Sequence, residues 1–344
     1  MNETGGLKDA TATDFYHPNT DDILIGSIFL FFSVFIIVCY IPCLIVIRTD
    51  REMKHPTFLM MFHLGIVDLV VLGAQIIAGF LLITGLGFSL SPWLNKVYGG
   101  LADGIGWYSY CALLHLIAFD RFLTMCMPVQ YRVFADMRNA KIGIAVCWLY
   151  TFLWVGVFMS PKASFIFTPA TFSFYFDISK PWYNLTKEVA WWQTFLFLNI
   201  SAIWYILIVF VMRQQRRKMT QTAQQLSIFK KELGILKQAA VVCFYTLIWD
   251  QYWHFAPNLF FKYRFKYAFA IGNLLWISNA AVNPLVYLTM NKRISRKVQR
   301  MLGMRGDVAP TTQSVNKSSA HPQALAKKST VAGPMTKKSF AAVG

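Results

Sequence analysis

One stretch near the middle of the chain decides how the rest is interpreted: DRFLTMCMPVQY, which runs from Asp120 to Tyr131. Its acid and base, Asp120 and Arg121, stand side by side at the end of a long apolar segment. A charge at the centre of a bilayer costs roughly 2.5 to 3.5 kcal/mol on insertion scales and less near the ends of a span, so such residues tend to mark function or a paired site. Pro128 and Tyr131 follow eight and eleven residues after Asp120. That spacing favours a functional motif over coincidence.

Composition places the chain among membrane proteins. Its 344 residues are 56% hydrophobic and only 14% charged, which excludes a pair of ordinary soluble domains. The net charge of +17 does not indicate nucleic-acid binding, because the basic residues flank apolar segments instead of forming a basic face. The six cysteines lie in or beside apolar stretches without a C-x-x-C pair, so no metal or redox site is expected.

Seven segments are long and apolar enough to cross a bilayer, which needs about 20 residues each. The sequence therefore predicts an all-α bundle of seven transmembrane helices. Their expected limits are Ile23–Ile47, Phe58–Leu82, Val97–Met127, Ile142–Met159, Val189–Met212, Ile235–Phe255 and Tyr267–Met290.

Lys and Arg set the expected orientation. Of 33 such residues, 25 lie in four stretches, Arg48 to Lys54, Arg121 to Lys141, Arg213 to Lys237 and from Lys292 onward, which all fall on one side of the predicted bundle. Positive loops stay inside, so the N-terminus is expected outside and the C-terminus inside a plasma-membrane protein. Asn2 and Asn184, each in an Asn-x-Thr acceptor, then lie outside and are expected to carry glycans. No cleavable signal peptide is apparent, so the first helix is expected to serve as the insertion signal.

The expected organisation has three parts. Residues 1–22 form an extracellular N-terminus, residues 23–302 form the transmembrane domain, and residues 303–344 form a disordered cytoplasmic tail rich in small and polar residues. Within the second part, residues 291–302 place Ile294 and Val298 on one face among basic residues. This pattern predicts a short amphipathic helix lying on an anionic leaflet.

A second motif lies in the seventh segment: Asn283-Pro284-Leu285-Val286-Tyr287. Proline kinks a helix by removing a backbone hydrogen bond, and Asn can satisfy the groups that are freed. Together, D-R-F-x5-P-x-x-Y in the third segment and N-P-x-x-Y in the seventh resemble the signatures of rhodopsin-like G-protein-coupled receptors. Asp68 in the second segment matches the acid that such receptors carry in mid-membrane.

Further stretches are similar to nematode serpentine receptors, with class T, a chemoreceptor family, as the nearest class. They are Tyr40-Ile41-Pro42-Cys43, Met60 to Asp68, Ala78-Gly79 with Thr84-Gly85, Gly99-Gly100 with Trp107, and Tyr287 to Ile294. This resemblance implies a rhodopsin-like fold, a small-molecule ligand, a heterotrimeric G protein as partner, and a place in the plasma membrane or cilium of a sensory neuron. It also implies a switch made of Asp120, Arg121, Phe122, Asn283, Pro284, Tyr287 and Asp68.

The chain also departs from the rhodopsin-like pattern. Phe122 replaces the usual Tyr, the first helix lacks Gly-Asn, the fifth lacks Pro, and Trp249 is not followed by Pro two residues on. No cysteine stands at the outer start of the third helix or between Ser160 and Glu188, so the usual loop disulfide is absent. The ligand-facing half is therefore expected to diverge.

Candidates for ligand contact are Asp103, Trp107, Trp249, Tyr252 and Trp253. Asp103 lies eighteen residues before Arg121, which is five turns of a regular helix and matches the acid that pairs with ammonium in amine receptors. Simple solvation or a partner such as Lys96 explains Asp103 equally well. The aromatic residues are as typical of a membrane interface as of a ligand cavity.

Candidates for G-protein contact lie in the loops expected inside: Pro128, Tyr131, Arg216, Arg217, Lys230 and Lys231. No catalytic motif is found, so the chain is not expected to be an enzyme and no cofactor is implied. The function favoured is a chemosensory receptor. The alternatives are an amine or peptide neuromodulator receptor, or a seven-helix ion or proton transporter or channel that uses its intramembrane acids.

Overall fold

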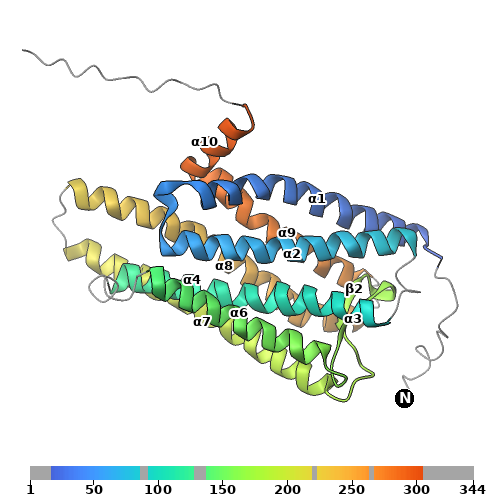
Figure 1. Cartoon of the computed structure of the whole chain (residues 1–344). Helices are drawn as coiled ribbons and strands as arrows, with labels where there is room; N and C mark the ends of the chain where they lie inside the picture. The colour runs from blue at the N-terminus through green and yellow to red at the C-terminus, as the bar shows by residue number, and fades with distance from the viewer. Residues whose placement is uncertain (1–16, 86–91, 128–136, 219–222, 263–266, 305–344) are drawn as a thin grey trace, which may run out of the picture. The chain divides into compact units, whose positions relative to one another are not determined.

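The computed structural model describes residues 17–85, 92–127, 137–218, 223–262 and 267–304. Seven helical segments in these ranges are long and apolar enough to cross a membrane, so the predicted seven-helix bundle is confirmed (Figure 1). The spans are α1 (Thr20–Thr49), α2 (Pro56–Thr84), α3 (Pro92–Gly100) continuing through η3 (Leu101–Tyr108) into α4 (Ser109–Cys126), α6 (Met137–Met159), α7 (Tyr183–Lys218), α8 (Ala223–Lys262) and α9 (Ala268–Met290). Shorter elements are η1 (Arg51–Met53), β1 (Phe165–Thr168), η4 (Pro169–Thr171), β2 (Ser173–Phe176) and α10 (Lys292–Met301).

The helices extend past the apolar segments because polar residues cap them. Asn19 accepts a hydrogen bond from the backbone of Asp22 at 3.1 Å, and the Asp22 carboxylate accepts one from the backbone of Asn19 at 2.7 Å. Such a reciprocal capping box satisfies backbone donors that the first turn leaves unpaired. At the other end of the bundle, α7 and α8 continue beyond the neighbouring helices (Figure 1).

Small residues set the spacing of α1 and α2. A Cβ added at Gly79 would lie 2.6 Å from the carbonyl oxygen of Gly26, which is closer than real contacts allow. Glycine at such a crossing lets two helix backbones approach and pack closely in a membrane. This contact fixes the position of α2, which carries Thr57 and Asp68.

The third span is not a regular α-helix. Leu101 to Tyr108 adopts a π-helical conformation between α3 and α4. A π-helical stretch holds more residues per turn than an α-helix and is frequent at functional sites. Residues in η3 therefore do not face the directions that regular helical spacing predicts for them.

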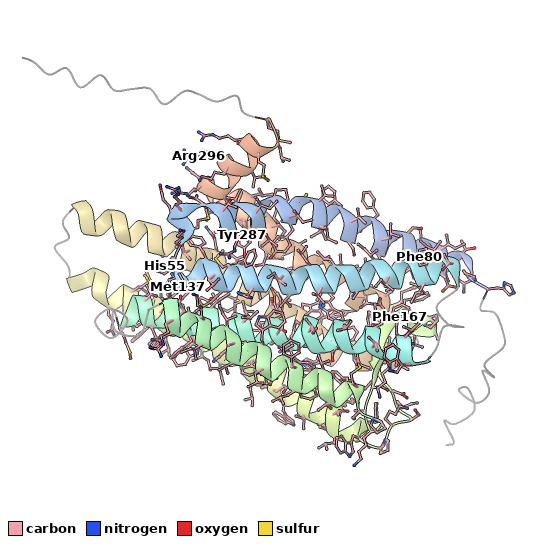
Figure 2. All side chains as sticks on the ribbon, viewed as in Figure 1. His55, Phe80, Met137, Phe167, Tyr287 and Arg296 are labelled. Atoms are coloured by element: carbon pink, nitrogen blue, oxygen red, sulfur yellow. The ribbon has the colours of Figure 1, made fainter. Side chains whose placement is uncertain are left out.

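A feature that the all-α prediction missed is an antiparallel hairpin, with Phe165 paired to Phe176 and Thr168 to Ser173. It defines one end of the bundle, here called the hairpin end. Arg121 and α10 lie toward the opposite end, here called the Arg121 end. Figure 2 labels Phe167 at the first end and Tyr287 and Arg296 toward the second.

Hydrogen bonds and close packing fasten the hairpin without a disulfide. The Asn95 amide accepts from the backbone N–H of Phe167 at 2.9 Å and donates to its carbonyl at 3.1 Å. Asn273 in α9 donates to the carbonyl of Phe172 at 2.7 Å. Gly99 lies so close that a Cβ there would stand 1.9 Å from the carbonyl oxygen of Phe165.

We expect Gly99→Ala to displace the hairpin, because its methyl group cannot share space with a backbone carbonyl. The expected result is a fall of several degrees in Tm, corresponding to about 1 to 3 kcal/mol for overpacking, and faster hydrogen exchange from Phe165 to Phe176. Gly156→Ala is the matched control, since nothing lies within 4 Å of a Cβ there. Equal behaviour of the two variants would contradict the proposed packing.

Candidate functional site

The Arg121 guanidinium is fully buried, with a side-chain exposure of 0%. Its Nη2 lies 2.6 Å from Oδ2 of Asp120, and Nε lies 3.1 Å from the same oxygen. Thr57, in the first turn of α2, donates its hydroxyl to Asp120 Oδ2 at 2.8 Å and accepts a hydrogen bond from Arg121 Nη2. The charge pair is thus closed by a third group from another helix.

Thr57 is a residue that sequence reasoning missed. Its hydroxyl has both a donor and an acceptor role, so it holds the acid and the base in a single arrangement. The only local signal is its place after Pro56, at the start of α2, and that position does not reveal a partner 63 residues away.

Tyr205 in α7 is a second missed residue. Its side chain is 2% exposed and its hydroxyl has no hydrogen-bond partner among the described residues. It lies close enough to Arg121 and Asp120 to interact with both electrostatically. Leaving a buried hydroxyl without a hydrogen bond is costly. The Tyr205 oxygen is therefore available to accept a hydrogen bond from Arg121.

Phe122 does not join these polar contacts. Its ring packs on that of Trp204 in α7, with ring centroids 4.6 Å apart. The residue next to Arg121 therefore fastens α4 to α7 through an apolar contact.

Asp68 forms a second polar network deeper in the bundle. Its Oδ2 accepts hydrogen bonds from the Tyr40 hydroxyl and from Asn283 Nδ2, both at 2.7 Å. Tyr287 is 2% exposed, and its ring centroid lies 6.3 Å from that of Tyr40. Asp68, Asn283 and Tyr287 are thus brought together, with Pro284 inside α9 between the last two.

A small, mainly apolar cavity adjoins this network. Its lining includes Leu64, Ile117, Gln238, Asn283 and Tyr287. The Oε1 atom of Gln238 is buried without a partner among the described residues. The cavity therefore lies where α2, α4, α8 and α9 meet, beside the Asp68 network.

The aromatic candidates gather toward the hairpin end. The rings of Trp107 and Trp249 meet edge to face at 4.3 Å, and the Trp253 ring lies 6.4 Å from that of Trp249. Tyr252 donates its hydroxyl to the carbonyl of Ala268 at 2.9 Å. These contacts join η3, α8 and α9.

Asp103 lies in η3, where side chains do not follow the directions of regular helical spacing. Because it lies in the π-helical stretch, its polar neighbours are Tyr108, five residues on, and Tyr150 in α6. Lys96, suggested as its partner, instead donates to the carbonyl of Ser160. The Asp103 carboxyl is 6% exposed, and its Oδ2 has no hydrogen-bond partner among the described residues.

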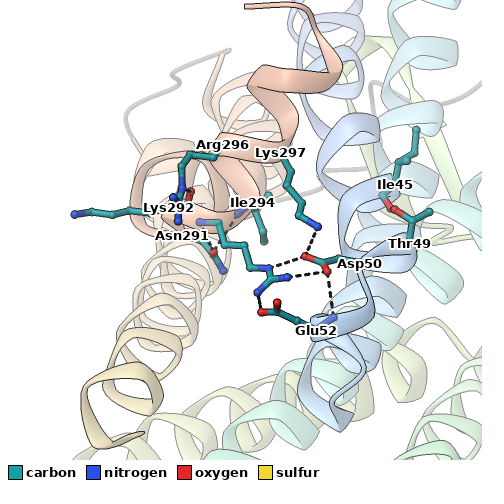
Figure 3. A network of polar contacts seen from close by, with 10 residues as sticks. Ile45, Thr49, Asp50, Glu52, Asn291, Lys292, Ile294, Arg296 and Lys297 are labelled. Carbon is teal, nitrogen blue, oxygen red and sulfur yellow. Dashed lines mark hydrogen bonds and ion pairs between the residues drawn. The ribbon is translucent and has the colours of Figure 1, made fainter. Parts of the chain in front are cut away.

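An ion cluster attaches α10 to the loop between α1 and α2 (Figure 3). Arg293 donates to both carboxylate oxygens of Asp50, at 2.6 and 2.8 Å, and pairs with Glu52, while Lys297 lies 2.9 Å from Asp50. The bond from Arg293 lowers the pKa of Asp50 below its usual range. The stabilisation is therefore present above pH about 4 and is lost as the pH falls through that lowered value.

Other predicted residues are placed as follows. Asn184 is exposed near the start of α7. Asn2, Pro128 and Tyr131 lie outside the described residues, and Arg216, Arg217, Lys230 and Lys231 lie in α7 and α8 at positions whose side chains are not described. Within the described ranges no group of three or more His, Cys, Asp or Glu side chains is placed to hold a metal.

Together, the seven spans and the polar groups at the Arg121 end define a seven-helix receptor fold. Squid rhodopsin has the same fold, with a TM-score of 0.65 at 15% identity over 84% of this chain and 88% of that one. The model of the serpentine type seven-transmembrane G-protein-coupled chemoreceptor family Srt matches residues 11–309. The chain belongs to this family, and is thus a multi-pass membrane protein of a receptor class.

Curated relatives agree with this assignment. Human olfactory receptor 6Q1 is 24% identical over 53% of this chain and 58% of its own length, and human olfactory receptor 2AG1 is 24% identical over 76% and 83%. The human motilin receptor is 32% identical over 26% of this chain and 24% of its own length. The chain spans less than two thirds of the length of several curated relatives: 58% of human olfactory receptor 6Q1 and 43% of human olfactory receptor 2A12.

We expect Asp50→Asn to release α10, because it removes the carboxylate that Arg293 binds with two hydrogen bonds and Lys297 contacts. Glu52→Gln is the matched control: it removes the same charge from the same partner, but its side chain is 69% exposed against 4% for Asp50. Exposed ion pairs contribute little, whereas a buried one is costly to break. Hydrogen exchange of α10 amides should therefore accelerate strongly in Asp50→Asn and little in Glu52→Gln. The reverse order would contradict this account.

Proposed function

We propose that the chain is a chemosensory receptor that detects an extracellular small molecule at the hairpin end and activates a heterotrimeric G protein at the Arg121 end. The observation that carries this proposal is the fully buried Arg121, held by Asp120 and Thr57 beside the unpartnered hydroxyl of Tyr205. A buried charge with an alternative acceptor nearby has two discrete arrangements. A switch requires such a pair of states.

In the resting arrangement, Thr57 ties α2 to the inner end of α4. When α8 moves away from the bundle, Arg121 leaves Asp120 and its guanidinium is received by Tyr205. The cavity lined by Gln238 and Tyr287 adjoins α8 and α9, the helices proposed to move. A ligand shifts the balance only by the difference between its affinities for the two arrangements.

The G protein is proposed to contact the basic extensions of α7 and α8, including Arg216, Arg217, Lys230 and Lys231. Pro128 and Tyr131, which stand between the third and fourth spans in the sequence, are proposed to contribute to the same surface. The Lys and Arg distribution supports an N-terminus outside and this surface inside. The same orientation would expose Asn2 and Asn184 to glycosylation. The receptor family supports a plasma-membrane location, with the cilium of a sensory neuron as the proposed site.

We expect Thr57→Val to raise ligand-independent nucleotide exchange on the G protein, because the isosteric change leaves Asp120 and Arg121 without their shared hydroxyl. The loss of hydrogen bonds to charged groups, worth about 1.5 to 3 kcal/mol, should increase basal exchange roughly tenfold. Thr124→Val is the control, since its hydroxyl bonds only to the backbone carbonyl of Asp120. Unchanged basal exchange in Thr57→Val at equal surface expression would contradict the resting arrangement.

We expect Arg121→Ala to abolish ligand-stimulated exchange and Tyr205→Phe to reduce it severalfold while leaving ligand affinity nearly unchanged. The Phe variant removes only the hydroxyl proposed to receive Arg121. The measurement is nucleotide exchange in membranes with a responsive chemical identified from a panel. A normal maximal response in Arg121→Ala would refute the switch.

A further inference from the structure

The tip of the hairpin, between η4 and β2, carries a buried residue with an unusual backbone, Phe172. It is 4% exposed, and its φ of 56° lies in the left-handed region. Within the described ranges it is the one residue other than glycine with a positive φ. A bulky side chain makes this conformation unfavourable, so it persists only where the surroundings hold it. The contacts of Phe172 therefore show which chemical groups the bundle binds at this place.

The start of α9 binds two features of Phe172. Its ring stacks on that of Tyr267, the residue that precedes α9, with ring centroids 6.3 Å and planes 21° apart. Its carbonyl accepts a hydrogen bond from Asn273 Nδ2 at 2.7 Å. The position therefore accommodates an aromatic ring together with a carbonyl acceptor.

Gln75 in α2 adds a third feature that Phe172 does not use. The side chains of Gln75 and Asn273 are both 0% exposed, and Gln75 Nε2 donates to Asn273 Oδ1 at 3.4 Å. This bond leaves Asn273 Nδ2 to donate to the carbonyl of Phe172. Gln75 Oε1 is buried without a hydrogen-bond partner among the described residues. Because a buried acceptor without a donor is costly, an occupant with an N–H beside its carbonyl complements these two amides better than Phe172 does.

We infer that Gln75, Asn273 and Tyr267 form a binding site for a neutral aromatic amide, which Phe172 occupies as part of the chain. The ligand stacks its ring on Tyr267, accepts a hydrogen bond from Asn273 Nδ2 and donates its N–H to Gln75 Oε1. It takes the place of Phe172, whose backbone then leaves the left-handed region. This inference rests on the proposed function, since it names the chemical class of the ligand at the hairpin end.

The test uses the full chain in lipid nanodiscs with three probes of similar length, each with a phenyl ring. Hydrocinnamamide has the ring-to-carbonyl spacing of a phenylalanine residue and an N–H donor. Benzylacetone has the same spacing without the donor, and butylbenzene has no polar group. At equal free aqueous concentrations, titrations of Tm should give dissociation constants that rise in that order, by about tenfold at each step, because each step leaves one more buried polar group unpaired. Equal or tighter binding of butylbenzene would overturn the inference.

Hydrogen exchange distinguishes displacement of the hairpin tip from binding elsewhere. Saturating hydrocinnamamide should accelerate exchange of the amides from Phe172 to Phe174 severalfold, because the tip loses its contacts with α9. A ligand bound beside an undisturbed tip would slow this exchange or leave it unchanged, and either result would overturn the inference. Both measurements use the wild-type chain, so a misfolded variant cannot obscure them.

Two variants locate the site. Gln75→Met has a similar shape but lacks the unpaired acceptor, so it should abolish the preference for hydrocinnamamide over benzylacetone. Phe172→Gly removes the competing ring and suits the left-handed backbone, so it should tighten binding of all three probes about tenfold or more. Ala170→Gly is the matched control, since it frees the backbone of an exposed residue in the same turn without removing a ring. A preference retained in Gln75→Met, or unchanged binding in Phe172→Gly, would overturn the inference.

Nucleotide exchange on the G protein separates this inference from the proposed function. If hydrocinnamamide displaces the tip but never stimulates exchange, the site is supported and the proposed activation from the hairpin end is refuted. If other chemicals stimulate exchange while none of the three probes binds at the tip, the receptor mechanism is supported and the aromatic-amide site is refuted.

Discussion

The buried guanidinium of Arg121 is the constraint on which the Arg121 end of the molecule depends. An arginine side chain stays charged at any physiological pH, so its burial obliges the fold to place acceptors around it. Adjacent positions on a helix do not face each other, and the pair with Asp120 is therefore completed by the hydroxyl of Thr57 from α2. A movement that separates α2 from α4 removes the Thr57 hydroxyl from this pair, and Tyr205 in α7 lies close enough to Arg121 to interact with it.

The buried carboxylates named above differ in their hydrogen-bond partners between the two ends of the bundle. Toward the Arg121 end, Asp68 is held by Tyr40 and Asn283, and α10 is held by Asp50. Toward the hairpin end, Asp103 and Asp250 each keep an oxygen without a partner among the described residues. Fully satisfied networks specify one geometry, whereas unsatisfied groups carry a free-energy cost that an added partner relieves. The carboxylates toward the Arg121 end therefore have a defined arrangement, whereas Asp103 and Asp250 each leave one oxygen available to an added partner.

The sequence was sufficient for the seven spans, because the length of each apolar stretch follows from the thickness of a bilayer, and its motifs single out Asp120 and Arg121. Asp103 shows where it was insufficient: a π-helical stretch depends on how the backbone packs, and no residue pattern in Leu101 to Tyr108 announces it. Thr57 and Tyr205 were missed because their importance arises from partners on other helices. The hairpin was missed although Phe165, Phe167, Phe172 and Phe174 lie on either side of Pro169, an alternation that is typical of paired strands.

The missing disulfide has a structural consequence for coupling between the ends. The hairpin is held by the amides of Asn95 and Asn273 and by its packing on Gly99, and each such contact contributes only about 0.5 to 1.5 kcal/mol net. A covalent link would keep the hairpin on α3 in every state, whereas these contacts can be exchanged. Because α9 carries both Asn273 and Asn283, a shift of α9 that loosens the hairpin also disturbs the Asp68 network. Coupling between two sites is reciprocal, so in the proposed mechanism a ligand that tightens the hairpin end would favour the arrangement of the Arg121 end that keeps the hairpin contacts.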